Sequence, residues 1–402
     1  MAENTLASYF EKFLSKESLF RDKRVLQANF FPDSIFHRDE QIKKLATIIA
    51  PCLKLEKPSN LFIYGKSGTG KTLTVKHVSD QILQVAREKD IKLKVLYINC
   101  KLKRVADTEY RLIAQFTRDL GKEIPSTGLP TDEVYKIFFS IVDSEKQLIV
   151  LILDEIDYLV KKVGDELLYN LTRINSDLKN SQISLIGISN NLMFSDNLDP
   201  RIKSSLSEEE LVFPPYNALQ LQDILTQRCE KAFKKGSLEQ GVVQKCAAYA
   251  AREHGDARRA LELLRVSAEM AERKNCISIK IEHLDEAEKE IEKNRVKDII
   301  FSQPKQQQLV LFAIISACSK RKRGVFTGEV YDLYKELCDQ TDLRALTQRR
   351  VSDIIAEYDL FGVINTNVIS KGRYGRTKEI TLVIEHSLVP NIKKIIQQSL
   401  NL

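Results

Sequence analysis

The chain has 402 residues, 43% of them hydrophobic, which is enough to bury the cores of two or three domains. No apolar run approaches the length of a membrane span and the first residues lack a signal-peptide pattern, so we expect neither a membrane protein nor a secreted one. The seven cysteines are scattered without a C-x-x-C pair and the five histidines stand apart, which argues against a zinc site and a disulfide framework. We therefore expect a cytoplasmic protein.

The first informative segment is Gly65-Lys66-Ser67-Gly68-Thr69-Gly70-Lys71-Thr72, which directly follows the apolar run 61–64. It fits the pattern G-x-x-x-x-G-K-[ST] between a strand and a helix, the context of a phosphate-binding loop. Its glycines let backbone N–H groups turn toward a phosphate, and the next helix adds its positive N-terminal end. Lys71 is expected to reach the β- and γ-phosphates, and Thr72 to ligate Mg²⁺. We therefore predict that residues 65–72 bind ATP or GTP.

Residues 1–215 alternate apolar strands with longer amphipathic stretches, the pattern of an α/β domain with a parallel sheet. The strands are expected at 61–64, 94–98, 148–153, 183–188 and 210–213. The third strand leads into Asp154, whose carboxylate is expected at the C-terminal edge of the sheet, where it would hold Mg²⁺ through water. Glu155, the next residue, is then placed to polarise an attacking water.

Two residues that follow the later strands fit the same site. Asn190 comes directly after strand 183–188 and is expected to orient the attacking water, although these residues would also suit the start of a turn. Arg201 lies at the end of this domain, where ring-forming ATPases present an arginine to the γ-phosphate of a neighbouring protomer. We predict that Arg201 acts in trans.

The character of the chain changes after residues 213–215. Helices are expected at 217–233, 240–253, 256–273 and 281–295 with no strand between them, which indicates a separate helical subdomain. Arg258 lies in the first turn of the third helix, where a positive charge is unfavourable for the helix dipole. A contact between Arg258 and the β- and γ-phosphates would compensate for this and couple the subdomain to the nucleotide.

The last part of the chain, residues 301–402, carries 15 Lys and Arg against 10 Asp and Glu, and so holds +5 of the formal charge of +7. Helices are expected at 306–319, 327–338 and 347–359, followed by strands 362–369 and 378–384. Three helices followed by a hairpin favour a winged helix-turn-helix, a common DNA-binding fold. The basic excess alone is a weak indication of nucleic acid.

The helix expected at 347–359 has two distinct faces. Four apolar residues recur with helical spacing and are expected to be buried: Val351, Ile354, Ile355 and Tyr358. Three polar residues then remain exposed near the N-terminal end, which enters the major groove in such folds: Gln348, Arg349 and Ser352. Arg349 suits a guanine edge or a phosphate equally well. Asp353 and Glu357 share an exposed flank and argue against deep insertion along the whole helix.

The turn between the two last strands is basic. Lys371, Arg373, Tyr374 and Arg376 stand among glycines, in a pattern suited to phosphate contact or entry into the minor groove. An ordinary solubilising hairpin tip is the alternative, and the basic run 320–323 fits a solvated loop as well as it fits DNA. The combination with a three-helix pattern favours DNA binding by the turn.

Taken in order, these elements resemble an AAA+ ATPase: phosphate loop, Asp-Glu strand, Asn190, Arg201 and Arg258. More narrowly, the chain resembles the archaeal origin-recognition and cell-division-control type replication initiators, which are AAA+ ATPases with a C-terminal winged helix. The resemblance covers nearly the whole chain. It rests also on Phe31-Pro32, His37-Arg38-Asp39-Glu40, Tyr97-Ile98-Asn99-Cys100, Asp154-Glu155-Ile156-Asp157, Leu198 to Leu206, Gly255 to Leu264 and Gly372 to Thr377.

The resemblance implies three parts: an AAA+ core with an N-terminal extension at 1–215, a helical lid at 216–300 and a winged-helix DNA-binding domain at 301–402. It implies a weak, switch-like ATPase that uses ATP, ADP and Mg²⁺. Such a protein binds origin duplex DNA in the nucleoid together with other initiator protomers. It also helps recruit or load the replicative helicase.

The resemblance also assigns roles to residues outside the motifs. Phe31 and Pro32 would help form the adenine pocket. Lys101, Lys103 and Arg104 would contact DNA from a helical insertion after the second strand.

Two other functions remain open from the residues alone. A signalling or defence P-loop ATPase would act on a protein partner, but the sensor repeats that such chains usually append are not found in these 402 residues. A clamp-loader-like ATPase would carry a helical collar in place of a basic hairpin.

Overall fold

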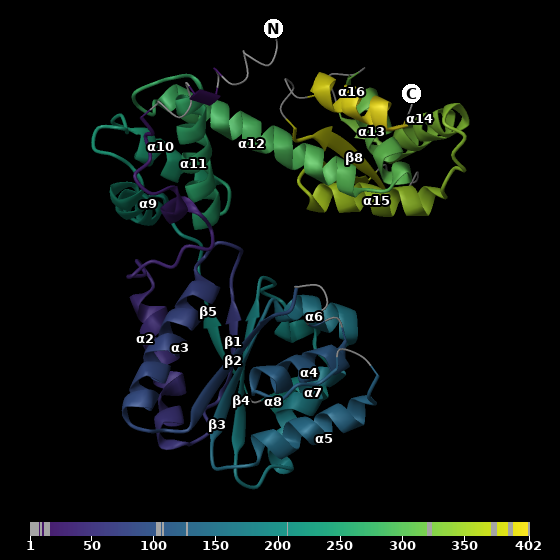
Figure 1. Cartoon of the computed structure of the whole chain (residues 1–402). Helices are drawn as coiled ribbons and strands as arrows, with labels where there is room; N and C mark the ends of the chain where they lie inside the picture. The colour runs from purple at the N-terminus through teal and green to yellow at the C-terminus, as the bar shows by residue number, and fades with distance from the viewer. Residues whose placement is uncertain are drawn as a thin grey trace. The chain divides into compact units, whose positions relative to one another are not determined.

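The structure is a computed structural model that describes residues 8, 10–11, 17–101, 106, 108–125, 128–206, 208–319, 324–370, 376–384 and 389–400, without the side chains of Asn197, Ser205, Glu208, Ser370 and Arg376. The chain divides into two compact units, Met1–Leu284 and Asp285–Leu402, and each is described by itself (Figure 1). The division falls within helix α12 (Ile281–Ser302), which also contains the boundary predicted near residue 300. Within the described ranges, no helix has both the length and the apolar character needed to cross a bilayer.

A parallel five-stranded sheet forms the centre of the first unit, as predicted. Its order is β2-β3-β4-β1-β5, with β1 (Asn60–Tyr64), β2 (Leu93–Asn99), β3 (Leu148–Asp154), β4 (Gln182–Ser189) and β5 (Glu208–Val212). Every residue of β3 is buried, as expected for a strand covered on both faces. The order places the C-terminal ends of β3, β4 and β1 side by side, next to the glycine-rich loop.

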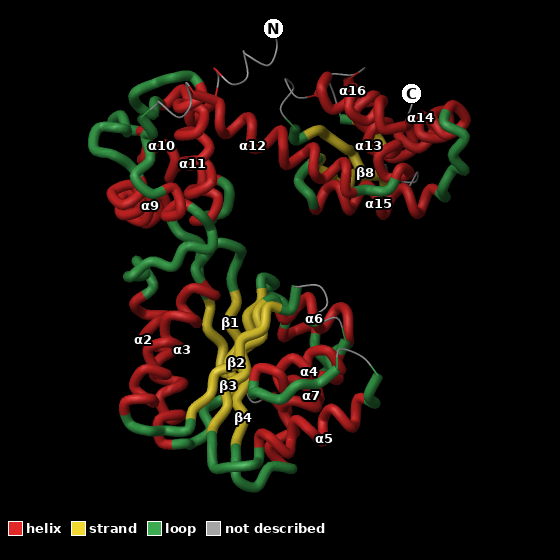
Figure 2. The backbone as a smooth tube through the Cα atoms, in the orientation of Figure 1, coloured by secondary structure: helices red, strands yellow, loops and turns green. Residues whose placement is uncertain are grey.

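Helices cover both faces of this sheet (Figures 1 and 2). One face carries α2 (Asp39–Ile49) and α3 (Lys71–Glu88), and the other carries α4 (Glu109–Asp119), α5 (Thr131–Val142), α6 (Ile156–Val163), α7 (Glu166–Arg173) and α8 (Pro200–Leu206). The alternation of side chains along β3 explains the two layers: Ile149 and Leu151 belong to one apolar cluster, and Val150 and Ile152 to the other. Short 3-10 turns connect these elements at Ala50–Lys54, Ile174–Ser176 and Ser195–Asn197.

The lid of the first unit is helical, with α9 (Ala218–Ala232), α10 (Val242–Arg252), α11 (Ala257–Arg273) and the start of α12. The N-terminal segment, which contains the 3-10 turn η1 (Lys23–Leu26), packs against these helices. The backbone N–H of Arg21 donates to the carbonyl of Ala232 at 2.7 Å, and Lys23 forms an ion pair with Glu269 at 2.7 Å. The segment upstream of the sheet is thus attached to the lid.

The second unit is a winged helix-turn-helix, as predicted. It contains α13 (Lys305–Ser319), α14 (Thr327–Gln340), α15 (Gln348–Leu360) and α16 (Val389–Leu400), with a sheet of order β6-β8-β7 made by β6 (Val325–Phe326), β7 (Ile364–Ser370) and β8 (Arg376–Leu382). Strands β7 and β8 pair in antiparallel fashion from Ile364 opposite Leu382 to Ser370 opposite Arg376. The strand β6 and the helix α16 were not predicted.

Candidate functional site

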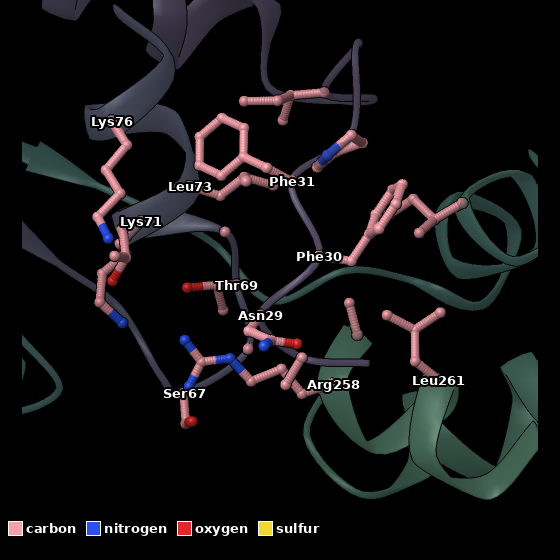
Figure 3. A pocket seen from close by; sticks show the side chains of 18 of the residues that line it. Asn29, Phe30, Phe31, Ser67, Thr69, Lys71, Leu73, Lys76, Arg258 and Leu261 are labelled. Carbon is pink, nitrogen blue, oxygen red and sulfur yellow. The ribbon is translucent and has the colours of Figure 1, made fainter. Parts of the chain in front are cut away.

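A cavity of about 360 Å³ lies at the C-terminal edge of the large sheet, within the size range of ligand sites. Four parts of the first unit line it: the N-terminal segment between residues 27 and 36, the glycine-rich loop with the start of α3, the C-terminal ends of β2, β3 and β4, and the lid helices α9 and α11 (Figure 3). A ligand in this cavity would therefore contact both the core and the lid.

The glycine-rich loop packs closely against the lid. Gly68 and Gly70 have positive φ angles of 71° and 90°, which side chains rarely adopt. A Cβ on Gly68 would lie 1.7 Å from Oδ1 of Asp256, so only glycine fits beside this carboxylate. The backbone N–H of Ala257 also donates to the carbonyl of Gly68 at 3.3 Å. The loop thus abuts the N-terminal end of α11, and two helix N-termini, those of α3 and α11, border the cavity.

Lys71 is buried at the base of the loop. Its ammonium donates to the carbonyls of Gly65 at 2.6 Å and Lys66 at 2.8 Å, and to Oδ1 of Asn190 at 2.9 Å. Burial lowers the pKa of Lys71 to about 8 against the opposing effect of Asp154, so the side chain is mostly protonated at neutral pH. A protonated lysine at the start of a helix is suited to bind phosphate.

The carboxylate of Asp154 joins the loop to the sheet. Its Oδ2 accepts hydrogen bonds from the hydroxyls of Thr72 at 2.8 Å and Tyr97 at 2.7 Å. Burial and the charge of Asp154 raise the pKa of Tyr97, which keeps its phenol a hydrogen-bond donor.

Thr72 and Asp154 supply oxygen ligands of the kind that Mg²⁺ prefers. Among the described residues, no group of three or more His, Cys, Asp or Glu side chains could hold a metal ion. Mg²⁺ typically binds one or two protein oxygens together with substrate phosphates, so the residues present fit a Mg²⁺–nucleotide complex.

Glu155 and Asn190 both line the cavity, where they were predicted to act on water. Glu155 has a left-handed backbone with φ of 57°, and its carboxylate lies 3.5 Å from the ammonium of Lys101. Lys101 was predicted to contact DNA, and in this structure its ion pair is with Glu155. Lys103 and Arg104 lie outside the described residues, so the DNA contacts of all three remain a prediction.

The two predicted arginines lie in different surroundings. Arg258 lines the cavity and extends from α11 toward Ser67 and the start of α3 (Figure 3). The side chain of Arg201 is 90% exposed, lies 3.7 Å from Asp199 and does not line the cavity. An exposed position fits an arginine that acts in the site of another protomer, which a single chain does not test.

Phe31 and Pro32 line the cavity together with Phe30, and their role in an adenine pocket stays a prediction. The neighbouring Arg228 of α9 is buried, with its guanidinium 4.7 Å from the centre of the Phe30 ring. Sequence reasoning missed Arg228, because an arginine in the middle of an amphipathic helix gives no sign of burial.

Arg38 was also missed as a part of the site. It is one of the largest fully buried side chains, and its guanidinium donates to the carbonyls of Thr69 at 2.9 Å and Pro214 at 2.7 Å. It also stacks 3.8 Å from the ring centre of Tyr216. Arg38 thus links the loop to the segment that leads into the lid. In the sequence, the segment His37 to Glu40 contributes only to the family resemblance.

Three family models match successive parts of the chain: an AAA domain at residues 55–192, a Cdc6 AAA+ ATPase-type lid domain at 222–289, and a CDC6 C-terminal winged helix domain at 298–391. The ORC1-type DNA replication protein of Pyrococcus abyssi is 49% identical over 391 residues, which cover 96% of this chain and 93% of that protein. ORC1-type DNA replication protein 1 of Methanosarcina mazei is 48% identical over 400 residues, which cover 99% and 95%. The chain belongs to the ORC1-type DNA replication proteins.

A solved structure agrees with this assignment, and a more distant one shares the fold. The Aeropyrum pernix ORC1 protein, solved in complex with DNA, has a TM-score of 0.82 and 42% identity to the ORC1-type chain described here, covering 95% of this chain and 98% of that one. A structure of Drosophila ORC bound to DNA has a TM-score of 0.60 at 20% identity and shares the fold. The predicted resemblance and fold class, an AAA+ core with a lid and a winged helix, are confirmed.

In the winged helix of this ORC1-type chain, α15 has the two faces that the sequence predicts. Its apolar face is buried: Val351, Ile354, Ile355 and Tyr358. Gln348 and Arg349 are exposed, whereas Ser352 is half-buried and its hydroxyl donates to the carbonyl of Gln348. Arg350 lies 3.9 Å from Asp353 and 3.5 Å from Glu357, so both flank carboxylates are paired within the helix. Their repulsion of a DNA phosphate is therefore reduced.

The basic turn of the wing is described only at its edges. Lys371, Arg373 and Tyr374 lie outside the described residues. Arg376 is the first residue of β8, and only its backbone is described. DNA contact by these four residues remains a prediction.

Proposed function

We propose that this ORC1-type chain is an ATP-dependent replication initiator that binds origin duplex DNA and helps recruit or load the replicative helicase. The supporting observation is its 42% identity, over 95% of its length, to the Aeropyrum pernix ORC1 protein solved in complex with DNA. In this proposal, ATP binding and slow hydrolysis to ADP act as a switch, and further initiator protomers assemble on the same DNA.

The nucleotide chemistry follows from the side chains around the cavity. Lys71 would bind the β- and γ-phosphates, and Thr72 and Asp154 would hold Mg²⁺. Mg²⁺, when bound, neutralises charge on the phosphate oxygens. Glu155 would polarise the attacking water and Asn190 would orient it.

The switch would depend on the lid. The hydrogen bond from Ala257 to Gly68 joins α11 to the loop that would bind the phosphates, and Arg258 of the same helix lines the cavity beside this loop. Loss of the γ-phosphate would remove one of the two phosphates predicted to attract Arg258, and so would weaken the contact between lid and core.

Hydrolysis by isolated protomers is expected to be slow, because Arg201 would have to come from a neighbouring protomer. ATP turnover per protomer should therefore rise with protein concentration on DNA and fall in the Arg201→Ala variant. A brisk rate in dilute protein that Arg201→Ala leaves unchanged would contradict the trans assignment.

DNA binding would use the winged helix, with Gln348, Arg349 and Ser352 of α15 facing the major groove. The basic turn, with Lys371, Arg373, Tyr374 and Arg376, would contact phosphates or the minor groove.

Binding to duplex DNA, measured across a salt series, tests this proposal. Affinity should fall steeply with salt, and Arg373→Ala or Arg376→Ala should each reduce the slope of log K against log salt by about 1. Arg24→Ala is the matched control, because Arg24 is exposed in the first unit and pairs with Asp22. Absence of binding at low salt would overturn the proposal, and footprinting on genomic DNA would locate the origin sequence.

A further inference from the structure

Tyr97 reaches the Asp154 carboxylate from the neighbouring strand. In the parallel pairing of β2 with β3, Tyr97 lies opposite Ile152, whereas Asn99 lies opposite Asp154. The phenol must therefore extend along the strands to place its hydroxyl 2.7 Å from Oδ2 of Asp154. A shorter hydroxyl side chain at this position would not span that distance.

The aromatic ring of Tyr97 contacts a lysine of α3. Lys76 lies on α3, one turn beyond Thr72, and its ammonium sits 4.1 Å from the centre of the Tyr97 ring. Both Tyr97 and Lys76 line the cavity. A cation over an aromatic face is attractive, so the helix that starts at the phosphate loop also orients the phenol.

Three donors hold the carboxylate of Asp154 and leave acceptor capacity on Oδ1. Oδ2 accepts from Thr72 and Tyr97, and Oδ1 accepts from the backbone N–H of Glu155 at 3.0 Å. Asp154 is only 4% exposed, so its orientation depends on these contacts. Thr72 is itself a predicted Mg²⁺ ligand. Of the two side-chain donors to Asp154, only Tyr97 therefore has no predicted contact with the metal.

We propose that Tyr97 is a positioning residue that fixes the Asp154 carboxylate for Mg²⁺ and thereby sets the metal affinity of the nucleotide complex. This inference rests on the proposed function, because it requires a Mg²⁺–nucleotide complex in the cavity. Residues that hydrogen-bond to a metal ligand from the outer shell typically change metal affinity 10- to 100-fold when they are removed.

The test is Tyr97→Phe, which removes one hydroxyl and keeps the ring beneath Lys76. Mn²⁺ replaces Mg²⁺ as the probe, because it also prefers oxygen ligands and is detected by electron paramagnetic resonance. The Mn²⁺ affinity of the protein–ADP complex is expected to fall about tenfold. The affinity for ADP in EDTA, where no metal binds, should stay within about twofold of the wild type.

Tyr135→Phe is the matched control. Tyr135 on α5 donates to the Glu109 carboxylate at 2.6 Å, so the control removes the same type of hydrogen bond, but Tyr135 does not line the cavity. It should leave Mn²⁺ affinity unchanged.

Three results would overturn the inference. Equal Mn²⁺ affinity of Tyr97→Phe and wild type would do so directly. An equal loss of ADP affinity with and without metal would show that Tyr97 shapes the pocket instead. If the wild type binds no Mn²⁺–ADP at all, the proposed function itself fails and the inference falls with it.

Discussion

Replacing Lys71 with alanine is expected to weaken ATP and ADP binding by roughly 100-fold or more. The ammonium would donate two or more hydrogen bonds to phosphate oxygens, and bonds to charged groups contribute about 1.5–3 kcal/mol each. A loss of 1.4 kcal/mol is about tenfold in affinity, so two such bonds account for the expected effect. Titration calorimetry or a fluorescent nucleotide would measure the affinity.

The control is Lys92→Ala, which removes the same charge directly before β2, at the end of the strand that is far from the cavity. Lys92 is exposed and pairs with Glu145 at 3.0 Å, so nucleotide affinity should not change. Circular dichroism must show that both variants are folded. A folded Lys71→Ala variant that binds nucleotide within about threefold of the wild type would refute the assignment of the loop.

The core sheet could be predicted because each strand has a local signal. β3 is apolar from Leu148 to Leu153 and ends in a carboxylate, as expected for a strand that is covered on both faces and leads into a charged site. Since parallel strands all end at the same edge, the polar residues after β3 and β4 were expected beside the phosphate loop. The structure places Asp154, Glu155 and Asn190 around one cavity.

In the second unit, β6 and α16 were not predicted, for different reasons. β6 is only Val325 and Phe326, too short to show a period, and it exists because β8 pairs with it. α16 does carry a helical signal, since Ile392, Ile396 and Leu400 are spaced by four and are buried. That spacing could have been read from the sequence.

The parts of the site that escaped prediction depend on contacts between distant segments. Nothing near Arg38 in the sequence shows that its guanidinium lies between Thr69 and Pro214. Likewise, nothing in the sequence shows that the ammonium of Lys101 faces Glu155, and the DNA contact that the resemblance implies for Lys101 stays a prediction. A local pattern predicts which end of a strand carries a residue, but not which partner its side chain meets.

Glu155→Gln is expected to retain ATP binding and to lower ATP turnover by about 100- to 10,000-fold, the usual contribution of a general base. Glutamine has nearly the same shape and can occupy the same left-handed backbone, but it cannot accept a proton from water. Binding should persist because the phosphate contacts come from the loop and Lys71. Single-turnover hydrolysis, measured with and without duplex DNA, separates the two steps.

Glu145→Gln is the control for this change, because Glu145 is an exposed carboxylate on the same domain that pairs only with Lys92 among its described ion pairs. It should hydrolyse ATP as the wild type does. If Glu155→Gln turns over ATP at the wild-type rate, Glu155 is not the base. If it loses binding as well, its carboxylate supports the cavity through Lys101, and the ion pair at 3.5 Å would be structural. Retained binding with lost turnover is the combination that only a catalytic role for Glu155 explains. Loss of a structural ion pair would be expected to weaken nucleotide binding together with turnover.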